Sequence, residues 1–203
     1  TIWKDVDGVL NADPRVFENT ILLEQISYQE AIEMAFYGAS VIHPKTIKPL
    51  ENKRIPLFVR SFENLESKGT KVSKGAQLVP KTNCFIVKKN QILVSFSTKD
   101  FSFMMEGNIS HIFKLLHQYK IKVNLIQNSA ISFSVCIEDN YSNFTDFYKE
   151  LHSSFTIKFN RDVTLFTIRH FDSKSIQEIE NKGTVLLKQN SRETVQLIIE
   201  GEN

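Results

Sequence analysis

The chain has 203 residues, of which 41% are hydrophobic and 24% charged, so it is long enough for one large globular domain or a few small ones. Its formal net charge is +2 and no basic tract exceeds two residues, which argues against nucleic acid and membrane surfaces as partners. No apolar run approaches the roughly 18 residues of a membrane-spanning helix, and we recognise no signal peptide.

The first residue is threonine, so we expect a fragment of a longer protein. The two cysteines, Cys84 and Cys136, lie far apart and lack the spacing of a metal site. Cys136 falls within the apolar alternation SFSVCIE, which predicts buried free thiols. Free thiols suit a reducing compartment, and we expect the cytoplasm.

The opening stretch WKDVDGVLNADPR, residues 3–15, combines three aspartates with a glycine, a proline and an arginine, which is typical of a loop at a functional site. An EF-hand calcium loop needs its glycine at position six, whereas Gly8 is fourth counting from Asp5, so we expect no metal site. A nucleotide-contacting loop fits better, because the planar guanidinium of Arg15 can bind phosphate. A structural Asp–Arg turn is the alternative.

The rest of the first zone, residues 1–74, alternates helix and strand. The segment SYQEAIEMAFY predicts a helix over 27–37, with Ser27 and Glu30 as a capping box and Gly38 as terminator. It is followed by a short helix PKTIKPLEN that begins at Pro44, a β-rich run at 55–62 and a polar turn at 66–72.

Residues 75–90 form a polar connector that ends in a strand, CFIVKK. Beyond residue 90 a series of strands and helices appears, and a shorter version of it follows. The first series comprises strand 92–97, helix 108–119, strands 123–129 and 131–138, and helix 141–151. The second comprises strand 163–168, helix 173–182 capped by Asp172 or Ser173, and strands 185–191 and 193–200.

The two series contain an internal repeat. VNLIQNS at 123–129 and VLLKQNS at 185–191 match at five of seven positions, and each precedes an alternating strand. We therefore predict two copies of one small β-α-β-β-α module of the ferredoxin-like kind. The second copy has no final helix, so two alternatives stay open. Either the module is naturally short, or a strand and a helix come from elsewhere, in which case CFIVKK at 84–89 or FTIKFNR at 155–161 completes its sheet.

This fold alone implies no function. RNA-binding modules share it, but the strand aromatics Phe96 and Phe133 alternate with serines in a way that fits a core, and the net charge is near neutral. Sensing of a small ligand is the stronger hypothesis. The turn MEGN at 105–108 offers free N–H groups at a helix start to a carboxylate, and QNS at 127–129 offers polar groups to an amino acid. The alternative is that Asn108 caps the helix and QNS forms a turn.

Three blocks of the first zone, WKDVDGVLNADPR, ISYQEAIEMAFYGASVIHPKTIKPL and IPLFVRSFENLESKGTKV, resemble the C-terminal portion of the amino-acid-kinase domain of aspartokinases. The downstream modules look like the tandem ACT domains of that family. The resemblance implies a mixed α+β and α/β fold: a kinase-domain C-terminal remnant followed by two ferredoxin-like βαββαβ (ACT) modules. The implied domains are a kinase remnant at 1–74, a linker and strand at 75–90, a first ACT domain at 91–160, and a short second ACT domain at 161–203 that borrows a strand from 83–90.

Aspartokinases phosphorylate the β-carboxylate of L-aspartate with Mg²⁺ and ATP, the first step toward lysine, threonine and methionine, which requires positioning and charge neutralisation. The resemblance implies an ATP site that includes Lys4, Asp5, Leu10, Arg15, Ser40 and Val41. Lys4, Leu10 and Ser40 depart from common family residues, which affects base and ribose contacts more than phosphate contacts. His43 matches the family's HP pair, and we interpret it as structural.

The family's K-F-G-G-T phosphate-binding segment and its aspartate-binding residues do not occur in this sequence. We therefore expect no catalytic residue in this fragment, no kinase activity from it alone and no cofactor requirement of its own. The missing N-terminal kinase portion is then its natural partner.

ACT domains of the family bind lysine or threonine at shared interfaces and pair in homodimers, which provides feedback inhibition. The resemblance places the effector site at Gly107, Asn108, Ile109, Asn124, Gln127, Asn128 and Ser129. Lysine-sensing members often carry carboxylates where this chain has Asn124 and Ala130, so lysine, threonine and loss of sensing all stay open. The second module lacks the MEGN turn, which favours a structural role. A stand-alone regulatory protein with a non-catalytic kinase remnant is the alternative function.

Overall fold

The computed structural model describes residues 1–39, 41–100 and 102–201. The chain forms two compact units, each built from several segments. The first contains Thr1–Val87, Phe166–Ile179 and Lys188–Gln196, and the second contains Lys88–Leu165, Glu180–Leu187 and Leu197–Asn203. Both units contain parts of the C-terminal segment 161–203. The domain boundaries expected at residues 74, 90 and 160 remain predictions.

The first unit contains a four-stranded sheet with the order β1-β3-β4-β2. These strands are β1 (Ile2–Lys4), β2 (Gln25–Ser27), β3 (Leu57–Ser61) and β4 (Thr70–Ser73). β1 is parallel to β3, β3 is antiparallel to β4, and β2 is parallel to β4. The core beneath this sheet is formed by buried side chains that include Leu23, Ile26, Tyr28, Ile47, Val59 and Val72.

Two helices complete this part of the chain, and both begin where the sequence predicts. α1 (Tyr28–Tyr37) is capped by Ser27, whose Oγ accepts a hydrogen bond from the N–H of Glu30 at 2.9 Å. Gly38 ends the helix with φ 125°, a conformation that favours glycine. α2 (Pro44–Asn52) has Pro44 in its first turn and His43 at the N-cap, with Nδ1 of His43 accepting from the N–H of Lys45 at 3.1 Å. This contact gives His43 the structural role expected from the sequence.

The second sheet has six strands in the order β6-β7-β5-β8-β10-β9. Its strands are β5 (Cys84–Thr98), β6 (Lys122–Asn128), β7 (Ser132–Glu138), β8 (Phe155–Arg169), β9 (Thr184–Asn190) and β10 (Thr194–Glu200). The helices of this region are α3 (Glu106–Gln118), α4 (Phe144–Leu151) and α5 (Ser173–Glu180). The order β6-β7-β5-β8, with α3 and α4 in the connections, is the ferredoxin-like βαββαβ pattern.

The second module reuses two of these strands. In it β8, α5, β9 and β10 follow one another along the chain, and β5 lies beside β8 as the fourth strand. The sheet order thus pairs β8 with the strand that begins at Cys84, the segment expected to be borrowed. The repeated sequences VNLIQNS and VLLKQNS form β6 and β9, which are the two edge strands of the sheet.

The prediction of separate strands at 84–89 and 92–97, and at 155–161 and 163–168, is wrong, because each pair forms one strand of 15 residues. The polar residues between them resemble turns in the sequence. In the structure Asn90 has φ 55° and Asp162 has φ 56°, and the strands continue through them. Asn and Asp adopt this left-handed conformation at low cost, so a single such residue interrupts the pleat without ending the strand.

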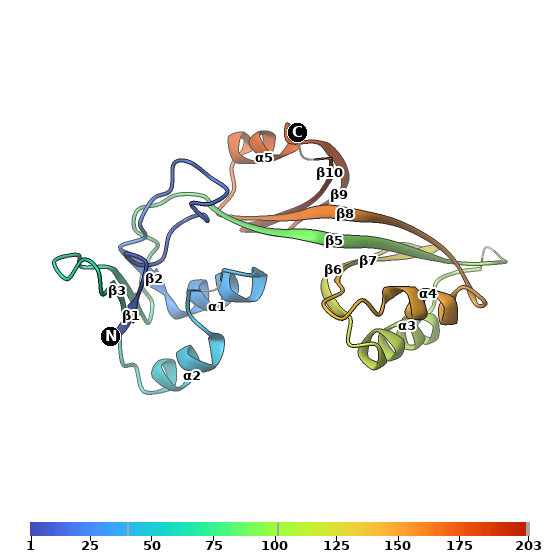
Figure 1. Cartoon of the computed structure of the whole chain (residues 1–203), viewed down its shortest axis with the longest axis horizontal. Helices are drawn as coiled ribbons and strands as arrows, with labels where there is room; N and C mark the ends of the chain where they lie inside the picture. The colour runs from blue at the N-terminus through green and yellow to red at the C-terminus, as the bar shows by residue number, and fades with distance from the viewer. Residues whose placement is uncertain (40, 101, 202–203) are drawn as a thin grey trace. The chain divides into compact units, whose positions relative to one another are not determined.

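The second unit has two cores of its own. Side chains of β5, β7, α3 and α4 form the larger one, which includes Phe96, Ile112, Phe133, Phe147 and Leu151. Figure 1 shows α3 and α4 on one side of β6 and β7. The smaller core contains Leu125, Cys136, Val163, Leu165 and Ile198.

Both cysteines are free and buried, as expected. In the described residues, no helix is long and apolar enough to cross a membrane.

Candidate functional site

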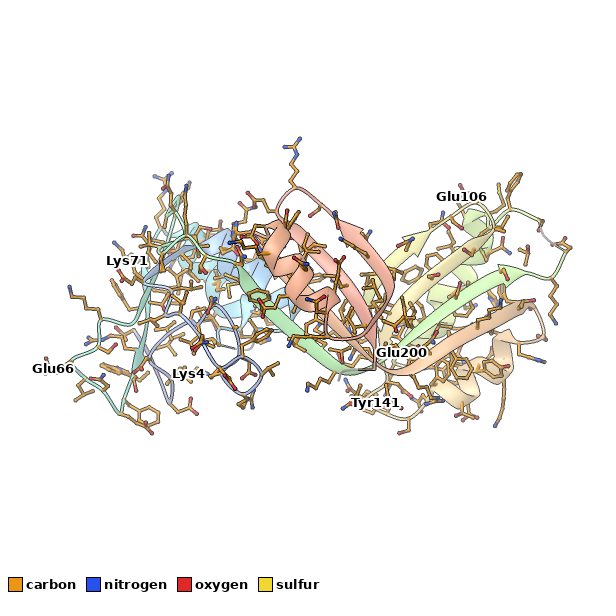
Figure 2. All side chains as sticks on the ribbon, turned by 90° about the horizontal axis from the view of Figure 1, so that it is seen from above. Lys4, Glu66, Lys71, Glu106, Tyr141 and Glu200 are labelled. Atoms are coloured by element: carbon orange, nitrogen blue, oxygen red, sulfur yellow. The ribbon has the colours of Figure 1, made fainter. Side chains whose placement is uncertain are left out.

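The residues assigned to the nucleotide site by resemblance lie in the first unit. Lys4 ends β1, and its carbonyl accepts from the N–H of Phe62 at 2.9 Å. Asp5 follows in the loop, and Leu10 forms an isolated bridge with Leu22. Figure 2 marks Lys4 and, on strand β4, Lys71. Ser40 lies outside the described residues, and the side chain of Val41 packs against the core of the first unit.

Arg15 projects into solvent and pairs with Asp13. Its Nη2 lies 2.7 Å from Oδ2 of Asp13, and its Nε donates to Oδ1 at 3.0 Å. The hydrogen bond from Arg15 is the largest cause of a lowered pKa at Asp13. The structural Asp–Arg turn considered from the sequence is therefore present. The guanidinium is still 85% exposed, so it remains accessible to a phosphate.

The first and third aspartokinase-like blocks meet at Thr70. Oγ1 of this buried residue accepts a hydrogen bond from the N–H of Val9 at 2.7 Å. The preceding Gly69 has φ 65°, and a Cβ there would lie 2.0 Å from the carbonyl oxygen of Val59. Only glycine fits this approach, so the Gly–Thr pair holds the opening loop against β4. In the sequence the Gly–Thr pair is recognisable only as part of the family pattern, and nothing in it indicates this contact.

Asn11 anchors the same loop at a second point. Its side chain is 5% exposed, with Oδ1 accepting from the N–H of Ile21 at 2.7 Å and Nδ2 donating to the carbonyl of Asn83 at 3.0 Å. The N–H of Phe85 donates to the carbonyl of Asn11 at 2.7 Å. The loop with Leu10 and Arg15 is therefore fixed to the start of β5. No local sequence pattern indicates this contact, because the partners are 72 residues apart.

A buried ion pair joins α1 to β8 within the first unit. Nε and Nη2 of Arg169 donate to the two carboxylate oxygens of Glu30 at 2.8 and 2.6 Å, and Nη1 donates to Oγ1 of Thr194 at 2.8 Å. The Glu30 carboxylate was expected to complete a capping box and binds Arg169 instead. Burial raises the pKa of this carboxyl, but the contacts with Arg169 and His170 outweigh burial and lower the pKa from 4.5 to about 2.

The first group of candidate effector residues lies in the first turn of α3, where Figure 2 labels the neighbouring Glu106. Oδ1 of Asn108 accepts from the N–H of Met105 at 3.0 Å, which is the capping role considered as the alternative. Gly107 is exposed, and a Cβ placed on it would meet no atom within 4 Å. Ile109 packs partly buried against the larger core of the second unit.

The second group lies on β6 and in the turn after it. Gln127 and Asn128 are exposed on this edge strand. Ser129 forms the turn expected as the alternative, since its N–H donates to the carbonyl of Ser132 at 2.8 Å and the two hydroxyl oxygens lie 2.7 Å apart.

Asn124 uses both ends of its amide within the chain. Its Oδ1 accepts from Nζ of Lys88 at 2.8 Å, and its Nδ2 donates to Oε1 of the buried Gln91 at 2.7 Å. Burial is the main cause of a lowered pKa at Lys88, and the charge of Lys122 lowers this pKa further. An effector would have to replace Lys88 or Gln91 in order to bind Asn124.

Across the described parts of the chain, no group of three or more His, Cys, Asp or Glu side chains could hold a metal ion. Arg15 presents an exposed guanidinium, and Gln127 and Asn128 present exposed amides, which are groups that hydrogen-bond to anions and to amino acids.

Comparison with known proteins identifies the class of protein to which the chain is similar. Residues 1–61 match the model of the amino acid kinase family. The chain is 34% identical over 160 residues to the chloroplastic bifunctional aspartokinase/homoserine dehydrogenase 2 of Zea mays, covering 76% of this chain and 17% of that protein. It is 31% identical over 144 residues to lysine-sensitive aspartokinase 3 of Escherichia coli, covering 71% of this chain and 32% of that protein.

Solved structures share the fold. The aspartate kinase of Clostridium acetobutylicum superposes with a TM-score of 0.83 at 22% identity, over 98% of this chain and 50% of that one. E. coli aspartokinase III, solved with aspartate and ADP, gives a TM-score of 0.79 at 22% identity, over 98% of this chain and 48% of that one. The chain belongs to the aspartokinase family, and it spans half or less of the length of these relatives.

Proposed function

We propose that this chain is the C-terminal regulatory portion of an aspartate kinase, the enzyme that phosphorylates the β-carboxylate of L-aspartate with ATP and Mg²⁺. The observation that carries this proposal is the chain order: an aspartokinase-like segment is followed by two ferredoxin-like modules that share β5 and β8. In such an enzyme the modules sense an end product of the pathway.

The first segment contributes one wall of the ATP site in this proposal. The exposed guanidinium of Arg15 supplies the charge for a phosphate. We assign Lys4, Asp5, Leu10 and Val41 to the same site by their positions in the family pattern, and Ser40, which is assigned with them, lies outside the described residues. E. coli aspartokinase III was solved with ADP, which supports a nucleotide at the corresponding site. We expect no aspartate-dependent ADP release from the chain alone. Robust turnover in a coupled assay would contradict this assignment.

The first module binds an amino-acid effector in this proposal, with lysine and threonine as candidates. At the first turn of α3, the N–H groups of Asn108 and Ile109 donate to the carbonyl of Met105 at 3.0 and 3.2 Å, so the backbone N–H of Gly107 is the group proposed to meet a carboxylate. Gln127 and Asn128 offer exposed amides. Asn124 and Ser129 complete the set, although both have partners within the chain. A lysine-bound structure of E. coli aspartokinase III supports the choice of ligand class.

The proposal includes a homodimer and a cytoplasmic setting. The edge strands β6 and β9 present backbone groups that a second copy can pair with, and the two buried free cysteines suit a reducing compartment.

Calorimetric titration of the chain with lysine, threonine and, as a control, glutamate tests the effector assignment. Binding of lysine or threonine but not glutamate is expected, and heat from none of them would contradict sensing by this chain.

A further inference from the structure

Lys88 lies on β5 in the second unit and holds its amino group against a neutral amide. Its Nζ donates to Oδ1 of Asn124 on β6 at 2.8 Å. A hydrogen bond to an amide oxygen stabilises an ammonium group less than a hydrogen bond to a carboxylate does. The side chain of Lys88 is half-buried, so its amino group is only partly hydrated and can still be reached from solvent.

A chain of amide hydrogen bonds fixes the orientation of Asn124. Its Nδ2 donates to Oε1 of Gln91 at 2.7 Å, and Nε2 of Gln91 donates to the carbonyl of Lys89 at 2.9 Å. Gln91 is 2% exposed, and its amide is held at both ends. Asn124 therefore presents its oxygen to Nζ of Lys88. An uncharged amine donates one hydrogen to this oxygen and keeps its lone pair free to attack an electrophile.

The surroundings of Lys88 favour this uncharged amine. Burial is the largest cause of a lowered pKa at Lys88, and the charge of Lys122 lowers this pKa further. The carboxylate of Glu138 acts in the opposite direction, but it also faces Lys122, whose Nζ lies 3.5 Å away. A Cys136 thiolate would raise the pKa of Lys88 as well, but burial raises the pKa of this thiol to about 12, so it is uncharged at neutral pH. Lys88 is therefore more nucleophilic than a fully hydrated lysine.

Lys122 gives the site a second property, an accessible positive charge. Its side chain is 59% exposed, and its charge acts on Lys88. An anionic electrophile that approaches Lys88 is attracted by this ammonium group. Acyl phosphates have the matching chemistry, because a reactive acyl carbon is bonded directly to an anionic phosphate.

We propose that Lys88 is a site of covalent acylation by acyl phosphates. The uncharged Nζ attacks the acyl carbon and forms a C–N bond, and the bond from this carbon to the phosphate oxygen breaks. The oxygen takes the electron pair and leaves as inorganic phosphate, while Nζ releases one proton to water. The product amide keeps one N–H, which can still donate to Oδ1 of Asn124, so the chain of hydrogen bonds is preserved. Phosphorylation of a carboxylate, as in the proposed function, yields a compound of this class, but the acylation does not depend on that assignment.

Incubation of the whole 203-residue chain with acetyl phosphate near neutral pH tests the proposal, with peptide mass spectrometry to follow each lysine. Lys114, an exposed lysine on α3 of the same unit, is the internal reference. Acetylation of Lys88 is expected to be about threefold or more faster than acetylation of Lys114, because a larger fraction of its amine is uncharged. A rate at Lys88 equal to or below that of Lys114 would overturn the proposal.

Two variants distinguish an activated amine from one that is simply accessible. K122M removes the positive charge beside Lys88 and should slow its acetylation by about threefold, whereas E138Q removes the opposing carboxylate and should accelerate it. K149M, which removes an exposed lysine paired with Asp146, is the matched control and should leave the rate unchanged. Lys122 is exposed, so K122M is expected to fold, and it decides the test if E138Q does not fold. A rate at Lys88 that does not fall in K122M, relative to Lys114, would overturn the proposal.

Discussion

At the scale of single residues, the most consequential contacts join positions far apart in the chain. Glu30 and Arg169 are 139 residues apart, and Val9 and Thr70 are 61 apart. Local patterns identify Glu30 only as a residue near a helix start, because sequence spacing contains no information about a partner on a distant strand. The helix cap at Ser27 was predictable from the sequence, whereas the binding of the Glu30 carboxylate to Arg169 was not.

Replacing Arg169 by methionine should destabilise the first unit. Removing one partner of a buried pair leaves an uncompensated charge, which costs about 3–5 kcal/mol. The double substitution E30M/R169M should recover most of this loss. Urea denaturation followed by circular dichroism measures both. K149M, which removes the exposed Lys149–Asp146 ion pair, is the control and should unfold like the parent, since exposed pairs contribute about 0–1 kcal/mol. Equal losses in the single and double variants would contradict the assigned role of the pair.

The same pair predicts an acid-sensitive stability. The pKa of Glu30 in the folded protein is about 2, below its ordinary value of 4.5. The pair therefore stabilises the fold fully above about pH 4.5, and this contribution is lost as the pH falls toward about 2. In E30Q the decline in the free energy of unfolding over this range should be shallower. Denaturation curves at several pH values measure it, and parallel declines in E30Q and the parent would contradict the assignment.

At the scale of elements, helices were predicted well and strand continuity was not. α1 begins after the capping residue Ser27 and α2 begins at Pro44, and sequence rules recognise both signals. β5 and β8 contain polar residues in a left-handed conformation, which sequence rules interpret as turns. β5 and β8 each lie between two neighbouring strands of the sheet, and a pattern read along one strand contains no information about its neighbours.

Asn90 offers a direct test of this strand geometry. Asn90 has φ 55°, and a β-branched residue is disfavoured in this left-handed region. N90V should therefore lower the free energy of unfolding by about 1–2 kcal/mol. N90G should be close to neutral. Thermal unfolding of the two variants separates them. A neutral N90V would mean that residue 90 does not adopt the left-handed conformation.

Gly107 tests the effector site at the start of α3. A methyl group there meets no atom within 4 Å, so G107A should stabilise the helix by up to about 1 kcal/mol. If an effector carboxylate approaches the backbone N–H of Gly107, the same methyl group should weaken its binding. Calorimetry and thermal unfolding of G107A measure the two effects. Unchanged affinity for the amino acid would place the effector elsewhere.

At the scale of the whole molecule, the repeat was the most informative feature of the sequence. VNLIQNS and VLLKQNS indicated two related modules, and the structure places them as the edge strands of one sheet. The sharing of β5 and β8 between the modules was only partly predictable, because the sequence showed that the second module lacks an element but not how its sheet is completed. The family was recognised from the sequence of the first zone, residues 1–74. The long-range hydrogen bonds of Asn11, Thr70 and Arg169 became visible only in the three-dimensional structure.

The central claim is that this chain senses an amino acid, and thermal unfolding with lysine, threonine, both or neither tests it most directly. A ligand at a hundred times its dissociation constant stabilises the folded state by about 2.7 kcal/mol. For a chain of this size we predict that one of the two amino acids raises the midpoint of unfolding by roughly 5–10 °C. An unchanged midpoint with either amino acid, alone or combined, would contradict the claim.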